Sequence, residues 1–187
     1  MINDKFILSL SINCIFTLGI FLTGCAKVPS SYNDDLIYID GYVLSKETGQ
    51  PYSGDYVRFY DNGQKEMEGI ITNGIRDGLW TYWNYKGQKI GEGSWIDNDK
   101  DGKWKWWYPN GNLKSEVTYV NQESEGLLTH YYENGQKMFE VNMKEGSREG
   151  YMAWWHENGS IKSEENFKND VRVGESIYYD EEGNRRW

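Results

Sequence analysis

The chain has 187 residues, a formal net charge of −9 and an aromatic content of 16%. Its low mean hydropathy of −0.80 is typical of disordered chains, but its aromatic content is not. Composition excludes collagen, coiled coils and multi-span membrane proteins. The acidic balance argues against nucleic acid as a partner, because phosphate contacts require Lys and Arg.

The N-terminal segment predicts a lipid-anchored protein. An apolar run over residues 6–22 ends in Leu22-Thr23-Gly24-Cys25, which is similar to the lipobox of bacterial lipoproteins, where a peptidase cuts before a lipidated cysteine. Acyl chains on Cys25 would anchor the protein, since each buried CH₂ contributes ~0.8 kcal/mol. We expect a signal peptide over 1–24, a lipidated tether over 25–35, and a location in the cell envelope, on the outer membrane or cell surface. The alternatives are a simple membrane anchor and an ordinary signal peptide.

The rest of the chain is an internal repeat. One glycine series steps by 24 residues through Gly54, Gly78, Gly102, Gly126, Gly150 and Gly174. A second series trails it by nine residues, through Gly63, Gly87, Gly111, Gly135, Gly159 and Gly183. Two glycine registers kept through six units indicate a repeat architecture. We expect an N-terminal cap over 36–53 and six repeats over 54–187, and we number repeat positions from the first glycine as zero.

Each repeat predicts a β-hairpin, so the expected fold class is all-β, an elongated antiparallel meander. Positions 1–6 are rich in Trp and Tyr. Positions 8 and 9 are Asn-Gly, the preferred two-residue type I′ turn, except that position 8 is Lys86 in the second repeat and Glu182 in the sixth. Paired positions then sum to 17, so position 3 faces position 14 and position 5 faces position 12. Positions 5 and 14 share one face, whereas 2, 4, 13, 15 and 17 share the other. Positions 19–23 are polar and predict a loop.

The repeat resembles the bacterial MORN-repeat variant, in the family labelled YwqK-type antitoxin. The matching segments are residues 78–83, 102–111 and 131–137, and residues 50–54 resemble that family's entry to its first repeat. The resemblance covers about 42–187 and implies an elongated antiparallel sheet used for protein contacts. The later repeats depart, with Val117, Val141 and Glu165 at position 15 of the third, fourth and fifth repeats in place of Gly69 and Gly93.

Two rows of side chains are candidate functional features. Position 14 holds Glu68, Glu92, Glu116, Glu140 and Glu164. This row is either an acidic binding groove or, as we favour, a structural ladder that accepts hydrogen bonds from the neighbouring strand. Position 5 holds Phe59, Trp83, Trp107, Tyr131, Trp155 and Tyr179. These rings, roughly 10 Å apart, form either a packing row or a partner-binding row.

Metal, cofactor and catalytic signals are weak. Asp97, Asp99 and Asp101 match the start of an EF-hand loop, but its twelfth position, which requires a bidentate Glu, is Tyr108. We interpret this segment as an acidic hairpin loop. His130 and His156 occupy different repeat positions, which argues against a shared metal site. No nucleophile-elbow spacing occurs, so we expect no enzyme, no cofactor and no metal.

Together these features predict a membrane-anchored, non-enzymatic scaffold for protein interaction, with antitoxin-like neutralisation of a partner as one form of that role. The alternative is a surface protein that binds cell-wall glycan. We expect the partner to be a protein with a basic, partly apolar patch. Trp107 and Trp155 would anchor it, and the acidic segment Asp97–Asp101 would steer its association.

Overall fold

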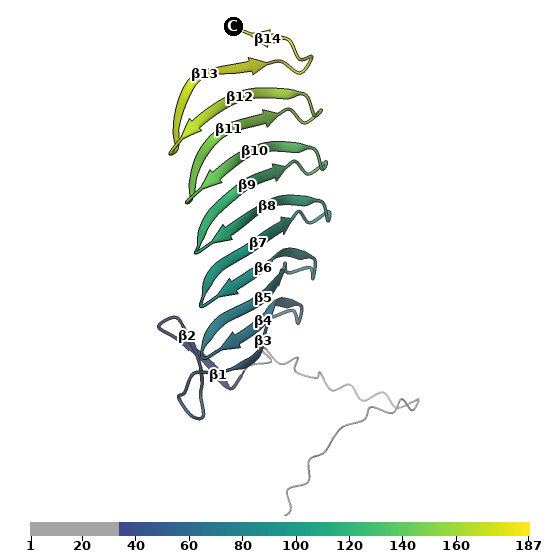
Figure 1. The fold of residues 1–187 in the computed structure, drawn as a ribbon. Helices are drawn as coiled ribbons and strands as arrows, with labels where there is room; N and C mark the ends of the chain where they lie inside the picture. The colour runs from purple at the N-terminus through teal and green to yellow at the C-terminus, as the bar shows by residue number, and fades with distance from the viewer. Residues whose placement is uncertain (1–33) are drawn as a thin grey trace, which may run out of the picture.

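The computed structural model describes residues 34–187, which form an elongated stack of strands rising from an N-terminal hairpin (Figure 1). Cys25, the predicted signal peptide and residues 25–33 of the predicted tether lie outside the described residues. In the part of the chain that is described, no helix is long and apolar enough to cross a membrane.

The sheet is a meander of consecutive antiparallel strands. Its twelve strands lie in chain order from β3 to β14, and a separate two-stranded sheet contains β1 and β2. The bounds are β1 Leu36–Ile39, β2 Tyr42–Ser45, β3 Gly54–Phe59, β4 Lys65–Thr72, β5 Ile75–Trp83, β6 Lys89–Ile96, β7 Asp99–Trp107, β8 Leu113–Val120, β9 Glu123–Tyr131, β10 Lys137–Lys144, β11 Ser147–Trp155, β12 Ile161–Lys168, β13 Val171–Tyr179 and β14 Arg185–Arg186. The all-β repeat fold is therefore confirmed.

The two kinds of turn are the reverse of the prediction. In the first Asn-Gly turn, Gly63 N–H donates to Tyr60 C=O at 2.9 Å and Tyr60 N–H donates to Gln64 C=O at 2.8 Å. Among these loop residues only Gly63 has a positive φ, of 82°. This is a three-residue loop with a glycine bulge and not a type I′ turn. The two-residue turns instead join successive repeats, as at Asn73 and Gly74, whose φ values are 51° and 85°.

The predicted loop at positions 19–23 is consequently too long. Only positions 19 and 20 form the turn, as at Asp97 and Asn98, whose φ values are 52° and 69°. Asp99 and Asp101 lie within strand β7. The acidic hairpin loop expected at Asp97–Asp101 is therefore a tight turn followed by a strand.

Pairing within a hairpin follows the predicted register up to a bulge. Val57 pairs with Glu68 and Gly54 with Ile71, as predicted for positions that sum to 17. Phe59 pairs with Lys65 and not with the predicted position 12, because the three-residue loop shifts the register by one.

A second bulge falls between repeats. Glu68 pairs with Thr81 and Ile70 pairs with Asp77. The three residues 78–80 therefore lie opposite the single residue Gly69. The φ of Gly78 is 71°, a left-handed value that glycine adopts without steric cost. The bulge recurs in every repeat and accompanies the curvature of the strands in Figure 1.

The N-terminal hairpin packs against the first repeat. Val43 of β2 is buried and belongs to the same apolar cluster as Ile71 of β4. Its N–H donates to Gly74 C=O at 2.7 Å, while Tyr52 N–H donates to Val43 C=O at 3.0 Å. The hairpin therefore covers this end of the apolar face.

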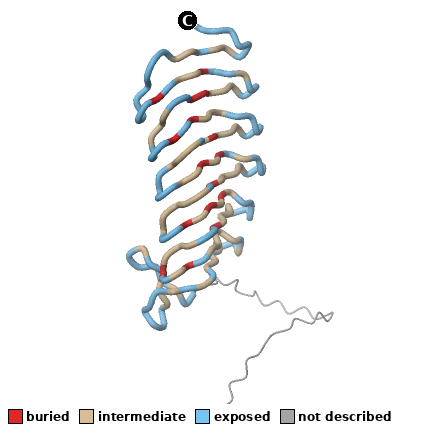
Figure 2. Tube along the Cα trace, in the orientation of Figure 1, coloured by how far each residue is buried: buried red, intermediate tan, exposed pale blue. Residues whose placement is uncertain are grey.

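The core lies mainly on one face of the sheet, at positions 2, 15 and 17, as short buried segments that reach from the N-terminal hairpin to β12 (Figure 2). One cluster contains Val43, Ile71, Trp80, Trp95, Trp104 and Val117, and the next contains Val141, Met143, Met152 and Phe167. The position 5 aromatics are only half-buried, so the main packing row is not theirs.

Candidate functional site

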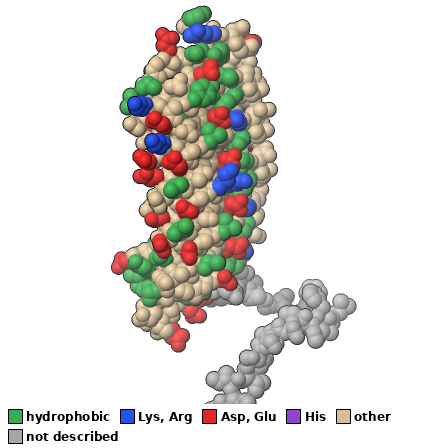
Figure 3. Space-filling view, in the orientation of Figure 1, with side chains coloured by type: hydrophobic (Ala, Val, Ile, Leu, Met, Phe, Trp, Pro, Cys, Tyr) green, Lys and Arg blue, Asp and Glu red, His purple; other side chains and the backbone are tan. Residues whose placement is uncertain are grey.

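The two faces of the sheet differ in chemistry. We call the face with positions 1, 3, 5 and 14 the glutamate face, and the face with positions 2, 4, 13, 15, 17 and 22 the groove face. Acidic side chains are distributed along the length of the molecule (Figure 3). The predicted sharing of faces is confirmed, since Tyr131 at position 5 donates to Glu116 at position 14.

Every carboxylate of the glutamate row has a donor, supplied in one of two ways. In three repeats a lysine at position 11 pairs with the glutamate three residues later, as Lys137 Nζ does with Glu140 at 2.6 Å. The equivalent pairs are Lys65 with Glu68 and Lys89 with Glu92. In the other two repeats a tyrosine at position 5 of the next repeat donates, as Tyr179 does to Glu164 at 2.7 Å.

The residue type at position 11 correlates with the residue type at position 5 of the next repeat. Where position 11 is Lys, the next position 5 is Trp, and the ammonium lies over its ring, 4.6 Å from the centroid for Lys89 over Trp107. Where position 11 is apolar, as at Leu113, the next position 5 is Tyr. The glutamates and the position 5 rings are thus parts of one contact set between repeats.

The two tryptophans predicted to anchor a partner already contact lysines of the same protein. Trp107 and Trp155 are half-buried, and each has a lysine over its ring, Lys89 and Lys137 respectively. Two phenols donate to Glu164, from Tyr151 and Tyr179, and hold the pKa of that carboxyl below its usual range. The glutamate face therefore uses its polar groups internally.

The groove face presents an aromatic strip made of two runs of ring contacts, one from Tyr56 to Tyr119 and one from His130 to Trp154. Trp104 lies at its centre, with ring centroids 5.2 Å from Trp95, 5.6 Å from Trp106 and 6.1 Å from Tyr82. Such distances suit offset or edge-to-face contacts. The strip continues across the sheet through Tyr56, Trp80, Tyr119, His130, Phe139 and Trp154.

Two indoles lie directly on glycines of the preceding strand. A Cβ placed on Gly69 would lie 2.3 Å from Trp80, and one on Gly93 would lie 2.1 Å from Trp104. The Trp104 indole N–H also donates to Ser94 C=O at 3.0 Å. Glycine at position 15 therefore makes room for tryptophan at position 2 of the next repeat. The later repeats, which lack this glycine, carry Leu128, Met152 and Ser176 at position 2.

A row of cations borders the strip at position 22. Arg76 lies 3.6 Å from the ring centroid of Trp95, and Arg148 lies 4.1 Å from that of Phe167. Lys100 Nζ lies over three rings, the nearest being Trp104 at 4.6 Å. Burial, and then the charge of Arg76, lower the pKa of Lys100. The sequence does not predict this row of cations, because position 22 falls within the loop predicted at positions 19–23.

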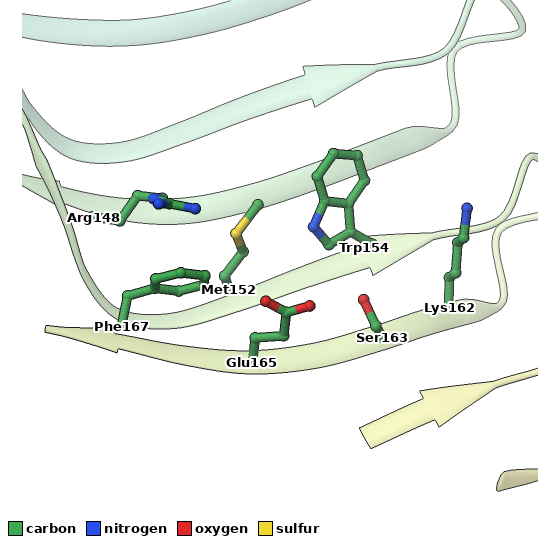
Figure 4. A pocket seen from close by; sticks show the side chains of 7 residues that line it. All are labelled: Arg148, Met152, Trp154, Lys162, Ser163, Glu165 and Phe167. Carbon is green, nitrogen blue, oxygen red and sulfur yellow. The ribbon is translucent and has the colours of Figure 1, made fainter. Parts of the chain in front are cut away.

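Three hollows lie along the groove face, and their lining is basic although the chain is acidic. Their cations are Arg58, Arg76, Lys114, Arg148 and Lys162. Among the described residues that line them, Glu165 is the one carboxylate. It lies on β12 beside Ser163, and both side chains project toward the same side as Trp154 of β11 (Figure 4). The groove face thus offers aromatic and basic groups together.

The described residues contain no group of three or more His, Cys, Asp or Glu side chains placed to hold a metal ion. His130 stacks on Phe139 with centroids 4.5 Å apart, whereas His156 Nε2 lies 3.1 Å from Tyr179 C=O. The two histidines therefore serve different contacts, on different positions of their repeats.

The fold defines a β-hairpin repeat protein with aromatic and basic side chains along one face of its sheet. The family model described as MORN repeat variant matches residues 100–121, 124–145 and 148–169. Each match spans one hairpin of the sheet and begins near position 22. These matches support a MORN-repeat protein, and such repeats suggest a role in binding. No curated protein matches the chain.

Proposed function

We propose that this protein is a non-enzymatic scaffold whose groove face holds a segment of another protein. The observation that carries the proposal is the groove itself, where half-buried rings at Tyr82, Trp106 and Trp154 lie beside cations on one face of the sheet. Aromatic and arginine side chains supply most of the energy at protein interfaces. A scaffold that binds a segment of its partner also blocks that segment from other contacts. Antitoxin-like neutralisation of the partner would occur in this way.

The groove changes the expected chemistry of the partner. Composition favours a basic partner, whereas Arg76 and Lys100 of the groove face, which form no ion pair within residues 34–187, favour an acidic one. The proposal keeps Cys25 as the anchor that holds the scaffold at the membrane, as the lipobox-like sequence predicts. The partner would then be a protein of the cell envelope.

Site-specific photocrosslinking in living cells tests the proposal. A photoreactive residue at Trp106 of the groove face should capture a protein, and capture should weaken when Arg76 is replaced by glutamine. Leu127, which is 54% exposed on the glutamate face, is the matched control position and should capture no such protein. Capture of glycan alone at Trp106 would favour the cell-wall alternative, and capture of one protein equally from both positions would contradict the groove as the site.

The anchor is tested separately. Cys25→Ala should leave full-length precursor and abolish lipid labelling, measured with a labelled fatty acid. Normal membrane retention with labelling intact would contradict the role of Cys25.

A further inference from the structure

We propose that the groove binds an extended acidic segment of a protein with a carboxylate at every third residue. The inference rests on the proposed function and adds the chemistry and spacing of the ligand. It follows from the geometry of two rows of side chains on the groove face and from one cation of that face, Lys100, that forms no ion pair within residues 34–187.

The two rows run along the stack, at right angles to the strands. The cation row at position 22 consists of Arg76, Lys100, Ser124, Arg148 and Arg172, with serine as its one neutral member. The aromatic row at position 4 holds Tyr82, Trp106, His130 and Trp154, each of which contacts a neighbouring ring. A chain lying along the stack would have cations on one side and rings on the other.

The spacing of the rows selects the conformation of the ligand. Successive members of a row are separated by two strands, which is roughly 9–10 Å. A polyproline II chain rises ~3.1 Å per residue and has three residues per turn, so every third side chain points the same way at roughly 9.3 Å intervals. Acidic residues three apart therefore match Arg76, Lys100 and Arg148, with a small polar residue opposite Ser124. Proline between them would suit the aromatic row, as in other aromatic-lined grooves.

Lys100 is the cation that most requires an anion. Its ammonium is half-buried over the rings of Trp104, Trp106 and Tyr119, at 4.6, 5.3 and 5.1 Å from their centroids. Within residues 34–187 it forms no ion pair. By contrast, Arg148 already contacts Asp170, with Nε 2.8 Å from Oδ1. A partly desolvated cation without a counter-ion is stabilised strongly by a carboxylate.

The sparse charge of the groove favours a peptide over nucleic acid. The cation row supplies about one positive charge per 9–10 Å, whereas one strand of B-form DNA carries a phosphate every ~3.4 Å. The net charge of −9 would also repel a polyanion. A peptide with isolated carboxylates matches the spacing of the cation row and, because it carries fewer charges, is repelled less.

Binding of synthetic peptides to the purified protein, as isolated from its host cells, tests the inference. The probe is a fluorescein-labelled twelve-residue peptide with aspartate at every third position and proline and leucine between, and binding is followed by fluorescence anisotropy. The control peptide has the same composition with its aspartates placed next to one another. We expect the spaced peptide to bind about tenfold more tightly, a difference of one well-placed charged contact.

Three variants locate the site. Lys100→Gln should weaken binding of the spaced peptide about tenfold, whereas the exposed Lys144→Gln, on the opposite side of the sheet, should leave it unchanged. Lys100→Glu should abolish binding of the spaced peptide and restore it for a peptide whose matching aspartate is lysine. The two peptides are compared on the same Lys100→Glu variant, so the switch in preference from aspartate to lysine does not depend on how much this substitution perturbs the fold.

The outcomes separate this inference from the proposed function. Equal affinity for both peptides, equal loss in Lys144→Gln, or tighter binding of an oligonucleotide or of anionic lipid vesicles would overturn the acidic-segment inference. If crosslinking at Trp106 still captures a protein, the scaffold proposal survives that result. Binding by the spaced peptide without any protein capture in cells would instead support the inference and contradict the proposed function.

Discussion

The contact between Gly93 and Trp104 gives the sharpest test of how adjacent repeats fit together. A Cβ at Gly93 would lie 2.1 Å from Cδ2 of Trp104, whereas carbon atoms in contact lie ~3.5–4.0 Å apart. The indole would have to move by about 1.5 Å. It would lose its 3.0 Å hydrogen bond to Ser94 and disturb its edge contact with Trp95. Overpacking costs ~1–3 kcal/mol and the hydrogen bond ~1 kcal/mol, so Gly93→Ala should lower the free energy of unfolding by about 2–4 kcal/mol.

A compensating change follows from the next repeat. Val117 and Leu128 occupy the positions that Gly93 and Trp104 occupy one repeat earlier. The double variant Gly93→Val with Trp104→Leu copies that pair. It should be more stable than the sum of its two single changes by roughly 1–3 kcal/mol, the usual range for coupled neighbours.

The assay is urea unfolding followed by far-ultraviolet circular dichroism, which does not depend on the tryptophan that is removed. Gly91→Ala is the matched control, because it lies on the same strand and its Cβ would meet Trp106 at 3.4 Å, an ordinary contact. It should change stability by less than about 0.5 kcal/mol. Wild-type stability in Gly93→Ala, or strict additivity in the double variant, would show that the indole does not depend on the glycine.

Three further predictions concern other contacts between repeats and the pH response. Lys137→Leu should cost ~0.5–1 kcal/mol in thermal unfolding, because the ammonium bridges Glu140 and Trp155, and added Trp155→Tyr should restore the loss by supplying a phenol. Asn134→Ala should cost ~1 kcal/mol in the same measurement, since its Nδ2 donates to the next turn at 2.9 Å, and an unchanged melting temperature would contradict this. Burial, and then a nearby lysine, lower the pKa of His130, so the unfolded chain binds that proton more tightly. Stability should therefore fall as the pH drops from 7 through the ordinary histidine pKa of ~6.5, and His130→Tyr should reduce that fall in urea titrations.

The sequence predicts the period, the hairpins and the two faces, because glycine spacing and the alternation of side chains are local signals. It predicts the wrong turn at Asn62-Gly63, because the same dipeptide suits both a type I′ turn and a three-residue loop with a glycine bulge. The structure shows what favours the second. Asn62 Nδ2 donates to Tyr85 C=O of the next repeat at 2.7 Å, while its Oδ1 accepts from Gln64 N–H at 3.0 Å.

The groove was harder to predict because its rows combine residues of adjacent repeats. Arg76 and Lys100 lie in strands because the turns before them have only two residues. The sequence predicts a loop at these positions, because the glycine that follows was the start of each predicted repeat. The match between Gly93 and Trp104 likewise joins two repeats, so it appears as a pattern only when the pairing between strands is known. Side chains that act across a repeat boundary are invisible to a comparison of repeats position by position.

The side-chain hydrogen bonds of the asparagines in the Asn-Gly turns all run in one direction along the chain, and this gives that edge of the molecule a polarity. Asn110 donates to Glu133 C=O, Asn134 to Glu157 C=O and Asn158 to Glu181 C=O, so each repeat donates to its successor. At the corresponding place the sixth repeat has Glu182, a carboxylate that cannot continue the series. A duplicated 24-residue repeat inserted among the inner repeats would accept a hydrogen bond from the asparagine amide of the repeat before it. Its own asparagine would donate to a backbone carbonyl of the repeat after it. Evolution, or an engineer, could therefore lengthen this protein by whole repeats in its interior, whereas extension beyond the sixth repeat would need a donor other than Glu182, as Gln88 provides in the second repeat.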